Sequence, residues 1–358
     1  MPSRVLSRTL VSIGLVLLGL LSQSVHGEEL CQETLRRIAF GSCASQNKNQ
    51  PIWKAIVAAR PDLFLMIGDN IYADTEDMAM MSAKYAELAA KPGFQKLRDV
   101  CPVLATWDDH DFGVNDGGSS YPKKIESQKI MLDFFDVPAD SPRRSREGVY
   151  GSYRFGPEGK RVQIILLDTR YFKSEMVADQ RSDEEKKRLG LVGWYVPNND
   201  PQATILGEEQ WKWLEQQLLE PADVRIIASS MQVIADEKGM ESWGNAPHER
   251  QRLYELIAST DAEGVVFISG DVHFSEISRT DDGPYPLYDF TSSGLTNSHE
   301  EWAAAVNTHR ISKIAYAKPT FGLIKIDWET ESPTIIFQAR GVKGDVVFKK
   351  SISLSELQ

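Results

Sequence analysis

Short apolar runs alternate with amphipathic stretches along most of the chain. Mostly apolar runs, typical of strands buried on both faces, occur at residues 37–40, 62–68, 103–107, 162–167, 225–228 and 265–269. Helical spacing of apolar residues predicts helices at 51–60, 80–100, 125–135, 208–219 and 249–258. Pro92-Gly93 is expected to interrupt the second of these helices. The alternation predicts an α/β fold in which helices cover the faces of a sheet.

Two regions depart from this alternation. Residues 322–327, 334–338 and 346–349 form a strand-rich last third, which predicts a second sheet. Residues 173–204 are charged and then rich in Gly, Pro and Asn. We expect this segment to be a long surface excursion that forms a rim of the functional site.

The N-terminus has the pattern of a secretory signal peptide. Arg4 and Arg8 precede an apolar run at residues 10–21, and Val25 and Gly27 stand at −3 and −1 of a cleavage site before Glu28. An uncleaved anchor is the alternative, although the run is short for a membrane span. No later stretch is long and apolar enough to span a bilayer. We therefore expect a leader at 1–27 and one catalytic domain at 28–358 in a periplasmic or secreted protein.

The net charge and the number of cysteines limit which functions agree with the sequence. The net charge of −11 argues against a nucleic-acid-binding surface, which needs clustered Lys and Arg. It does not exclude phosphate esters, because bound metal supplies positive charge locally. The three cysteines are an odd number for an exported chain. Either one thiol is free, or one binds metal while the other two pair.

Clusters of metal-binding side chains follow four of the predicted strands. They are FGSC ending at Cys43, IGDNIY with Asp69 and Tyr72, TWDDHD at residues 106–111, and SGDVH with Asp271 and His273. A single aspartate after a strand is most often a turn or helix cap, but four such clusters are hard to explain by capping. Ligands bind outside the carboxyl ends of strands in open α/β sheets, so these residues are expected to converge on one rim.

The side chains in these clusters are of three ligand types. Carboxylates suit Ca²⁺, Mn²⁺ or Fe³⁺, imidazole suits transition metals, and thiolate selects a softer or strongly Lewis-acidic metal. A rim that holds all three predicts at least two unlike metals. Asp69 and Asp271 are able to bind metal in bidentate or bridging fashion. Metals bridged in this way generate hydroxide at neutral pH and stabilise an in-line displacement.

These motifs resemble those of the PhoD-like alkaline phosphatases, a branch of the calcineurin-like metallophosphoesterases. The resemblance runs in order from about residue 38 to 294 and is carried by FGSC (40–43), PDLFLMIGDNIYAD (61–74), ATWDDHDFGVND (105–116), LDTRYF (167–172), EEQWKWLEQQL (208–218) and SGDVHFSEI (269–277). It implies an α-β-β-α sandwich of two mixed sheets flanked by helices. It also implies hydrolysis of phosphate mono- or diesters at a site with Fe³⁺ beside Ca²⁺, other divalent metals being the alternative.

The resemblance assigns metal ligands residue by residue. Cys43 as thiolate, Tyr72 as phenolate and His273 would bind iron. Asp69 would bridge the metals, and Asp271 would lie on the calcium side. These implied roles agree with the ligand types of the four clusters.

The WDDHD motif supplies the implied catalytic residue. Asp109 takes the place of the asparagine in the superfamily's Asn-His-Asp/Glu motif, and His110 is that motif's catalytic histidine. His110 would stabilise or protonate the leaving oxygen. Asp108 either binds metal or hydrogen-bonds its own loop.

Other candidates have a structural alternative. Arg170 either grips a phosphate oxygen or forms an internal ion pair, and Asn70 is a second candidate for binding substrate. Gln232, in the sequence SSMQ, is expected to orient water or substrate rather than to bind metal. With Cys43 assigned to metal, a disulfide between Cys31 and Cys101 is expected at the end of the sheet opposite the site.

The sequence therefore predicts an exported phosphoesterase in which a metal-bridged hydroxide attacks small-molecule or lipid phosphate esters in line. A non-catalytic protein that captures metal or phosphate on the same fold is one alternative, opposed by the complete ligand set and by His110. A phospholipase-D-like phosphodiesterase is another. An exposed apolar rim near residues 175–200 would support it, but the sequence is mainly charged there.

Overall fold

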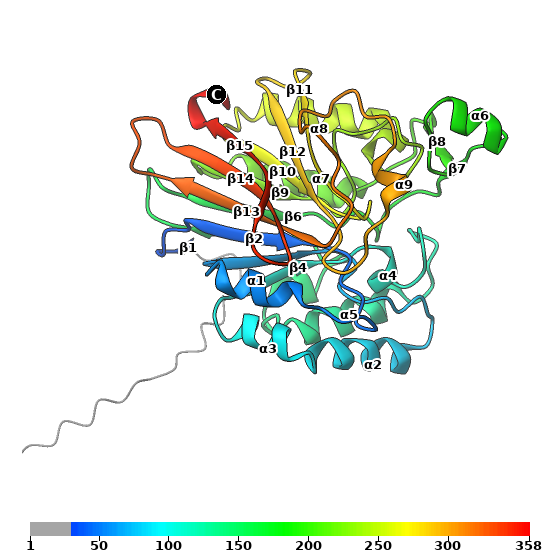
Figure 1. Cartoon of the computed structure of the whole chain (residues 1–358), viewed down its shortest axis with the longest axis horizontal. Coiled ribbons are helices and arrows are strands. Elements are labelled where there is room, and N and C mark those ends of the chain that lie inside the picture. The colour runs from blue at the N-terminus through cyan, green and yellow to red at the C-terminus, as the bar shows by residue number, and fades with distance from the viewer. Residues whose placement is uncertain (1–29) are drawn as a thin grey trace, which may run out of the picture.

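Two mixed β-sheets lie face to face between helices in the computed structural model, which describes residues 30–358 (Figure 1). The ring of Phe290 on one sheet stacks on Phe337 of the other, with centroids 4.5 Å apart. Apolar side chains from both inner faces form one continuous core between the sheets. The predicted α/β class and the sandwich of two mixed sheets are confirmed.

The first sheet has seven strands and a mainly parallel centre. Its order is β1 (Leu30–Cys31), β5 (Gly151–Phe155), β6 (Val162–Leu166), β9 (Val224–Ala228), β10 (Val265–Ser269), β12 (Leu287–Ser292) and β11 (Ser275–Thr280). Strands β6, β9, β10 and β12 are parallel; β5 is antiparallel to β6 and parallel to β1, and β11 is antiparallel to β12. The predicted strands at 162–167, 225–228 and 265–269 lie in this parallel centre.

The second sheet has six strands and joins the two ends of the chain. Its order is β15 (Val346–Ser353), β14 (Thr334–Gly341), β13 (Thr320–Asp327), β2 (Arg37–Gly41), β3 (Leu63–Ile67) and β4 (Val103–Thr106). β13 pairs antiparallel with β2, whereas β2, β3 and β4 are parallel. The second sheet that the last third predicts is present, but these strands share it with β2, β3 and β4. The strands of the last third extend the sheet that the first strands begin.

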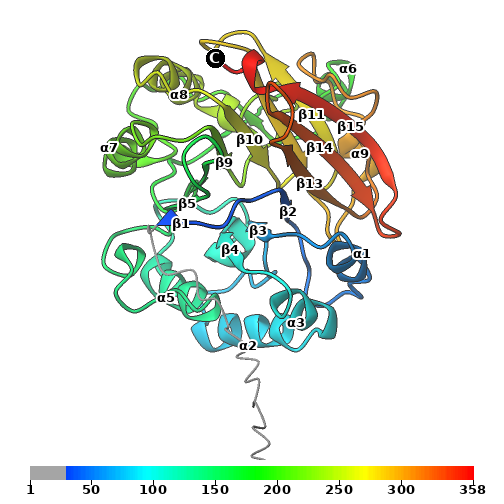
Figure 2. The same cartoon turned by 90° about the vertical axis from the view of Figure 1, so that its left-hand side faces the viewer.

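Helices cover the outer faces of the parallel strands (Figure 2). α1 (Ile52–Ala58), α2 (Met78–Ala89), α3 (Pro92–Arg98) and α5 (Lys124–Phe134) lie beside β2, β3 and β4. α7 (Gly207–Leu218) and α8 (Pro247–Ser259) lie beside β9 and β10. The predicted 80–100 helix is two helices, because Pro92 begins the second one.

Short elements complete the fold. They are α4 (Asp109–Phe112), α6 (Asp183–Arg188), α9 (Glu300–Ala303), β7 (Val177–Ala178), β8 (Tyr195–Val196) and the 3₁₀ helices η1 (Pro142–Arg144), η2 (Trp243–Asn245) and η3 (Leu354–Glu356). α6, β7 and β8 form the predicted 173–204 excursion, which projects beside α9 at one end of the sheets (Figure 1).

The structure does not contain the expected disulfide between Cys31 and Cys101. Cys31 and Cys101 are both free thiols. Cys31 packs against the core between the two sheets, whereas Cys101 belongs to the cluster under α1, α2 and α3. Burial raises the pKa of the Cys101 thiol to about 12, so it is a packing residue in this fold.

The expected leader at 1–27 lies outside the described residues. Within residues 30–358, no helix combines the length and apolar character needed to cross a bilayer.

Candidate metal centre

The candidate ligands follow strands of both sheets at one end of the sandwich. Cys43 comes after β2, Asp69 after β3, Asp109 after β4 and Asp271 after β10. The parallel run β2, β3 and β4 presents its carboxyl ends at one edge, and the bridge between Ser42 and Ser293 joins that edge to the opposite sheet. The predicted convergence on one rim is therefore observed.

One group of ligands gathers around Cys43. Its Sγ lies 3.5 Å from Oδ2 of Asp69. The Tyr72 hydroxyl donates to the same Asp69 oxygen at 3.0 Å and lies 3.2 Å from Nε2 of His273. Ligand atoms of Cys43, Asp69 and His273 all lie within 4.8 Å of one another. We call Cys43, Asp69, Tyr72 and His273 the thiolate cluster.

A second group consists of carboxylates. Asp108, Asp109 and Asp271 bring one oxygen each within 4.8 Å of the others, and so do Asp109, Asp116 and Glu241. We call these five residues the carboxylate cluster. Asp109 also groups with Asp69 in the same way, so the two clusters are contiguous. This placement of Asp69 fits the bridging role that the resemblance implies.

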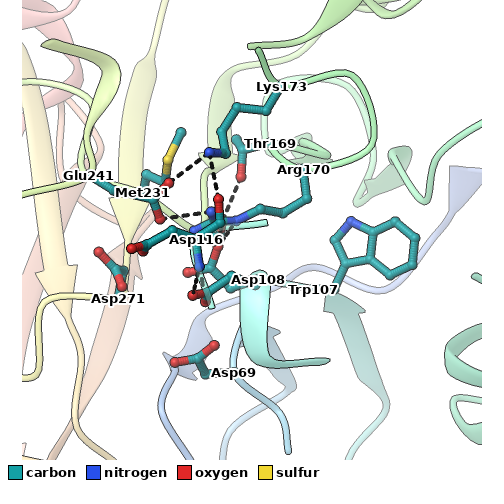
Figure 3. A network of polar contacts seen from close by, with 12 residues as sticks. Asp69, Trp107, Asp108, Asp116, Thr169, Arg170, Lys173, Met231, Glu241 and Asp271 are labelled. Carbon is teal, nitrogen blue, oxygen red and sulfur yellow. Dashed lines mark hydrogen bonds and ion pairs between the residues drawn. The ribbon is translucent and has the colours of Figure 1, made fainter. Parts of the chain in front are cut away.

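Two buried, positively charged side chains, Arg170 and Lys173, lie among the carboxylates of this cluster (Figure 3). Arg170 Nε lies 2.5 Å from Asp108 Oδ1, and Arg170 Nη1 lies 2.7 Å from Glu241 Oε2. Lys173 Nζ lies 2.8 Å from the other Glu241 oxygen. Arg170 is fully buried and paired, which supports the ion-pair interpretation and contradicts its expected contact with substrate.

Several buried carboxylate oxygens have no protein donor. Asp69 Oδ1, Asp108 Oδ2 and Asp109 Oδ1 are buried without a hydrogen-bond partner. An unpartnered buried polar atom costs free energy, and buried carboxylates normally pair or coordinate metal. The unpartnered oxygens point to metal ions as the missing partners, and the mixture of thiolate, phenolate, imidazole and carboxylate suits unlike ions. The residues present fit a centre with two or more metals.

The two carboxylate oxygens of Asp108 have different surroundings. Its Oδ1 accepts from Arg170 and from the Ser230 hydroxyl at 2.7 Å, while Oδ2 has no partner. One oxygen therefore fixes the loop and the other remains available to a metal.

The backbone at these positions is unusual. Cys43, Asp69, Asp271 and His273 have φ between 49° and 67°, a left-handed conformation that is uncommon for residues with a side chain. Such strain persists where surrounding contacts fix it, and it concentrates at functional sites. Gly68 before Asp69 has φ of 107°, and a Cβ there would lie 2.6 Å from Cβ of Asp108. Glycine is therefore required for the close approach of the two ligand loops.

Two fully buried carboxylates hold the ligand loops without facing the cavity. Asp111 accepts from the backbone nitrogens of Asp69 at 3.1 Å and Asp108 at 2.7 Å. Asp168, in the LDTRYF motif, accepts from Trp107 Nε1 at 2.8 Å and from the Arg170 nitrogen at 2.9 Å. These contacts join the loops after β3, β4 and β6 into one unit.

Asn70 and Gln232 belong to the surrounding framework. Asn70 is fully buried, its amide nitrogen donates to Thr106 and Asp111, and it is not part of the cavity lining. Gln232 donates to Glu276 at 2.9 Å and accepts from Lys238, away from both clusters. Its side chain supports the polar core of the seven-stranded sheet.

His110 is held by a carboxylate that the sequence analysis missed. Nδ1 of His110 lies 2.7 Å from Oδ1 of Asp74, which leaves Nε2 for the cavity. Burial lowers the pKa of His110, but Asp74, Asp69 and Asp109 outweigh burial and raise it to about 10. The contact with Asp74 favours the protonated ring, as a general acid requires.

The other pKa values follow from burial and from mutual repulsion. Burial, reinforced by neighbouring negative groups, raises the pKa of Asp69 and of Asp271 well above the usual range. Burial lowers the pKa of His273 to about 4, which keeps its imidazole neutral. Burial also raises the pKa of Cys43 to about 12. A bound cation would reverse the cost of ionising these acids, because it supplies the opposite charge.

A cavity of about 370 Å³ opens above the clusters. Its lining includes the site residues His110, Asp109, Asp271 and His273 and the aromatic residues Trp194 and Trp302. The 173–204 excursion thus contributes to the rim, as predicted. It exposes Val177, Leu189 and Trp194 beside the charged helix α6.

Three functional candidates escaped the sequence analysis. Asp74 and Asp116 lie within the quoted motifs GDNIYAD and DFGVND, so their acidic character was the available signal. Glu241 lies in a loop with no preceding strand, and nothing in the local pattern marks it. Only the fold brings Glu241 to the cluster.

Comparisons with known proteins agree with this geometry. A family model described as PhoD-like phosphatase matches residues 38–331. Alkaline phosphatase D of Bacillus subtilis (strain 168) is 23% identical over 275 residues, which cover 66% of this chain and 46% of that protein. The chain thus spans about half the length of this relative.

Solved structures share the fold. The structure of PhoD matches with a TM-score of 0.69 and 16% identity, covering 92% of this chain and 72% of that one. GAP50, described as the anchor in the inner membrane complex of Plasmodium, matches with a TM-score of 0.57 and 13% identity over 90% of this chain and 89% of its own. At these identities the matches establish the fold alone.

Proposed function

Because the chain belongs to the PhoD-like phosphatase family, we propose that it is an exported, metal-dependent phosphoesterase that hydrolyses phosphate monoesters or diesters. The unpartnered oxygens of Asp69, Asp108 and Asp109 beside His110 carry this proposal. These carboxylate oxygens are available to bind metal ions, and His110 beside them is available to donate a proton. The catalytic domain is proposed to span residues 28–358.

We assign Fe³⁺ to the thiolate cluster and Ca²⁺ to the carboxylate cluster. Cys43, Tyr72 and His273 offer thiolate, phenolate and imidazole donors that suit a strongly Lewis-acidic ion such as Fe³⁺, whereas Asp108 and Asp271 offer oxygen donors that suit Ca²⁺. When bound, such metals polarise phosphoryl oxygens and activate water at neutral pH. Arg170 and Lys173 balance part of the negative charge that remains in the carboxylate cluster.

His110 moves a proton in the proposed reaction. Asp74 orients its ring and stabilises the imidazolium, so that Nε2 faces the cavity with a proton to donate. Transfer of that proton to the departing ester oxygen prevents the build-up of negative charge on it. Asp74 acts through His110 and is a positioning residue.

Metal analysis paired with turnover tests the proposal. The purified protein is expected to contain iron and calcium by mass spectrometry and to hydrolyse p-nitrophenyl phosphate, bis(p-nitrophenyl) phosphate or both. A protein that retains metal and binds phosphate, but turns over neither ester, would instead be the non-catalytic alternative. That alternative is a real competitor because GAP50, described as an anchor, has a similar fold.

Export has a separate test. Expression of the whole chain followed by N-terminal sequencing of the extracytoplasmic protein is expected to yield a mature chain that begins at Glu28. Recovery of only the full-length chain in the membrane fraction would favour the uncleaved anchor.

A further inference from the structure

Two tryptophans form one wall of the cavity above the candidate metal centre. Trp194 and Trp302 line it together with His110, Asp109 and Asp271, and their rings meet edge to face at 5.9 Å and 84°. Trp194 is 50% exposed. Its indole belongs to the same cavity lining as His110 and Asp109.

Trp302 is fixed by the metal centre itself. Its ring stacks on His273 at 4.9 Å and 17° and on His299 at 4.4 Å and 18°. It also packs against the small apolar cluster of Met240, Val272 and Phe274. Trp302 therefore contacts the candidate metal ligand His273, and these contacts fix the plane of its ring.

Trp194 is fixed by the backbone around it. Its carbonyl accepts from the Asp179 nitrogen at 2.8 Å in the β7–β8 ribbon. The nitrogens of its neighbours Gly193 and Tyr195 donate to the Lys238 and Gly239 carbonyls at 3.1 and 2.8 Å. Trp194 thus projects from a rigid support over the cavity, and its exposed surface is available to a ligand.

We propose that Trp194 and Trp302 form a subsite for a planar aromatic group of the ester, such as an aryl or nucleobase-bearing alcohol. The inference rests on the proposed phosphoesterase function and specifies its substrate class. A phosphoryl group at the clusters would place its ester substituent in the same cavity, against the indoles. Aromatic rings prefer the stacked and edge-to-face contacts that such a wall provides.

An alkyl chain and a quaternary ammonium group are the other occupants that an aromatic wall accepts. A flexible alkyl chain would lose conformational freedom on a flat wall and gain no stacking. A quaternary ammonium group makes a cation–π contact instead of a stacked one, and phosphocholine in the test below distinguishes it. A planar ring keeps the stacked and edge-to-face contacts without the loss of conformational freedom.

Calorimetric titration with two phosphonates tests the subsite without turnover. Methylphosphonate and phenylphosphonate share the anionic group that the metals would hold and differ in the ring. Phenylphosphonate is expected to bind the metal-loaded protein about tenfold more tightly, since stacking of one base on an aromatic side chain is worth about 5- to 150-fold. In Trp194→Ala this preference should fall to about twofold or less, with the affinity for methylphosphonate unchanged.

Matched variants separate stacking from simple loss of bulk. Trp194→Phe should retain most of the preference, and Leu189→Ala, in the same excursion but outside the cavity lining, should leave it intact. Equal affinity for both phosphonates in the unchanged protein overturns the subsite while leaving the phosphoesterase proposal standing. Tighter binding of octylphosphonate or of phosphocholine than of phenylphosphonate would also overturn the aromatic subsite and leave the phosphoesterase proposal standing. Binding of neither phosphonate by the metal-loaded protein overturns both proposals.

Discussion

The two clusters at the candidate centre balance their negative charge differently. The carboxylate cluster contains Arg170 and Lys173, which pair with Asp108 and Glu241. Within residues 30–358, no Lys or Arg forms an ion pair with Asp69 or any other member of the thiolate cluster. The protein therefore carries part of the balancing charge of one cluster in its own sequence and leaves the other to a bound ion.

This difference bears on stability as well as chemistry. A buried charge without a partner is costly, whereas a paired one is tolerated. The carboxylate cluster should keep its architecture when metal is removed, because buried cations hold it. The thiolate cluster should depend on metal for its ionised form, because burial raises the pKa of Cys43, Asp69 and Tyr72 alike.

Replacement of the shared ligand should have the largest effect. Asp69→Asn removes the carboxylate that adjoins both clusters, so we expect loss of iron and weaker calcium binding. Loss of several kcal/mol of metal-derived stabilisation lowers turnover by about 10³-fold or more. Metal content and kcat measured together check this. The exposed Asp99→Asn serves as control, and full metal retention in Asp69→Asn would contradict the bridging assignment.

His110 lies where the two clusters meet but is proposed to act on the leaving group. His110→Ala should fold and retain its metals while losing about 10²–10⁴-fold in kcat. The loss should be smaller for esters with good leaving groups, which need less protonation. Asp74→Asn should show the same trend to a lesser extent, because it acts through His110. A His110→Ala protein that loses a metal ion would make His110 a ligand instead.

Replacement of Arg170 tests whether this buried cationic side chain stabilises the carboxylate cluster. Arg170→Met leaves Asp108 and Glu241 buried with one partner fewer, and breaking a buried pair costs about 3–5 kcal/mol. The free energy of unfolding should fall by that amount in metal-free protein and by less with calcium present. Arg252→Met, at an exposed pair with Glu208, should cost about 1 kcal/mol or less. Equal losses in the two variants would show that Arg170 does not stabilise the cluster.

The pH dependence of the metal-free protein follows from the raised pKa values. Burial first, with neighbouring groups, raises the pKa of Asp108 and of Asp111 to about 7, and that of Asp69 and Asp271 still more clearly. A carboxyl whose folded pKa exceeds its unfolded value contributes stability below the unfolded value, 3.8, and loses it as pH rises through the folded value. Metal-free protein should therefore be less stable at pH 8 than at pH 5.

Thermal unfolding measures this trend. The Tm of metal-free protein should fall by about 5 °C or more between pH 5 and pH 8, and metal-loaded protein should show a smaller fall. Asp109, whose pKa is lowered to about 2, acts in the opposite direction only below pH 4. A Tm that rises with pH in the metal-free protein would contradict the charge balance described above.

The smallest expected effect is spectroscopic and concerns the thiolate cluster alone. If Fe³⁺ binds there, Tyr72 as phenolate and Cys43 as thiolate give a visible charge-transfer band. Tyr72→Phe should shift or abolish that band, Cys43→Ser should perturb it, and Tyr288→Phe should leave it unchanged. A colourless, fully active protein containing only Zn²⁺ or Ca²⁺ would refute iron and leave the phosphoesterase proposal intact.

Much of the fold and of the ligand set could be predicted because the signals are local. Buried strands such as β3 are apolar at every position, and the ligands stand directly after them. The predictions that failed concern contacts between segments that lie far apart in the sequence. The last strands alternate buried and less buried positions in β14, which predicts a strand but not its partner, and only the fold paired β13 with β2.

The sequence by itself determined which side chain types stand at the strand ends, because those residues are neighbours of the strands along the chain. Only the tertiary structure decided that Arg170 pairs with both Asp108 and Glu241, that Cys31 and Cys101 lie in different apolar clusters, and that Trp194 contacts Trp302. The physical reason is that charge balance, thiol pairing and aromatic contact depend on distances between segments far apart in the chain, and packing of the two sheets sets those distances.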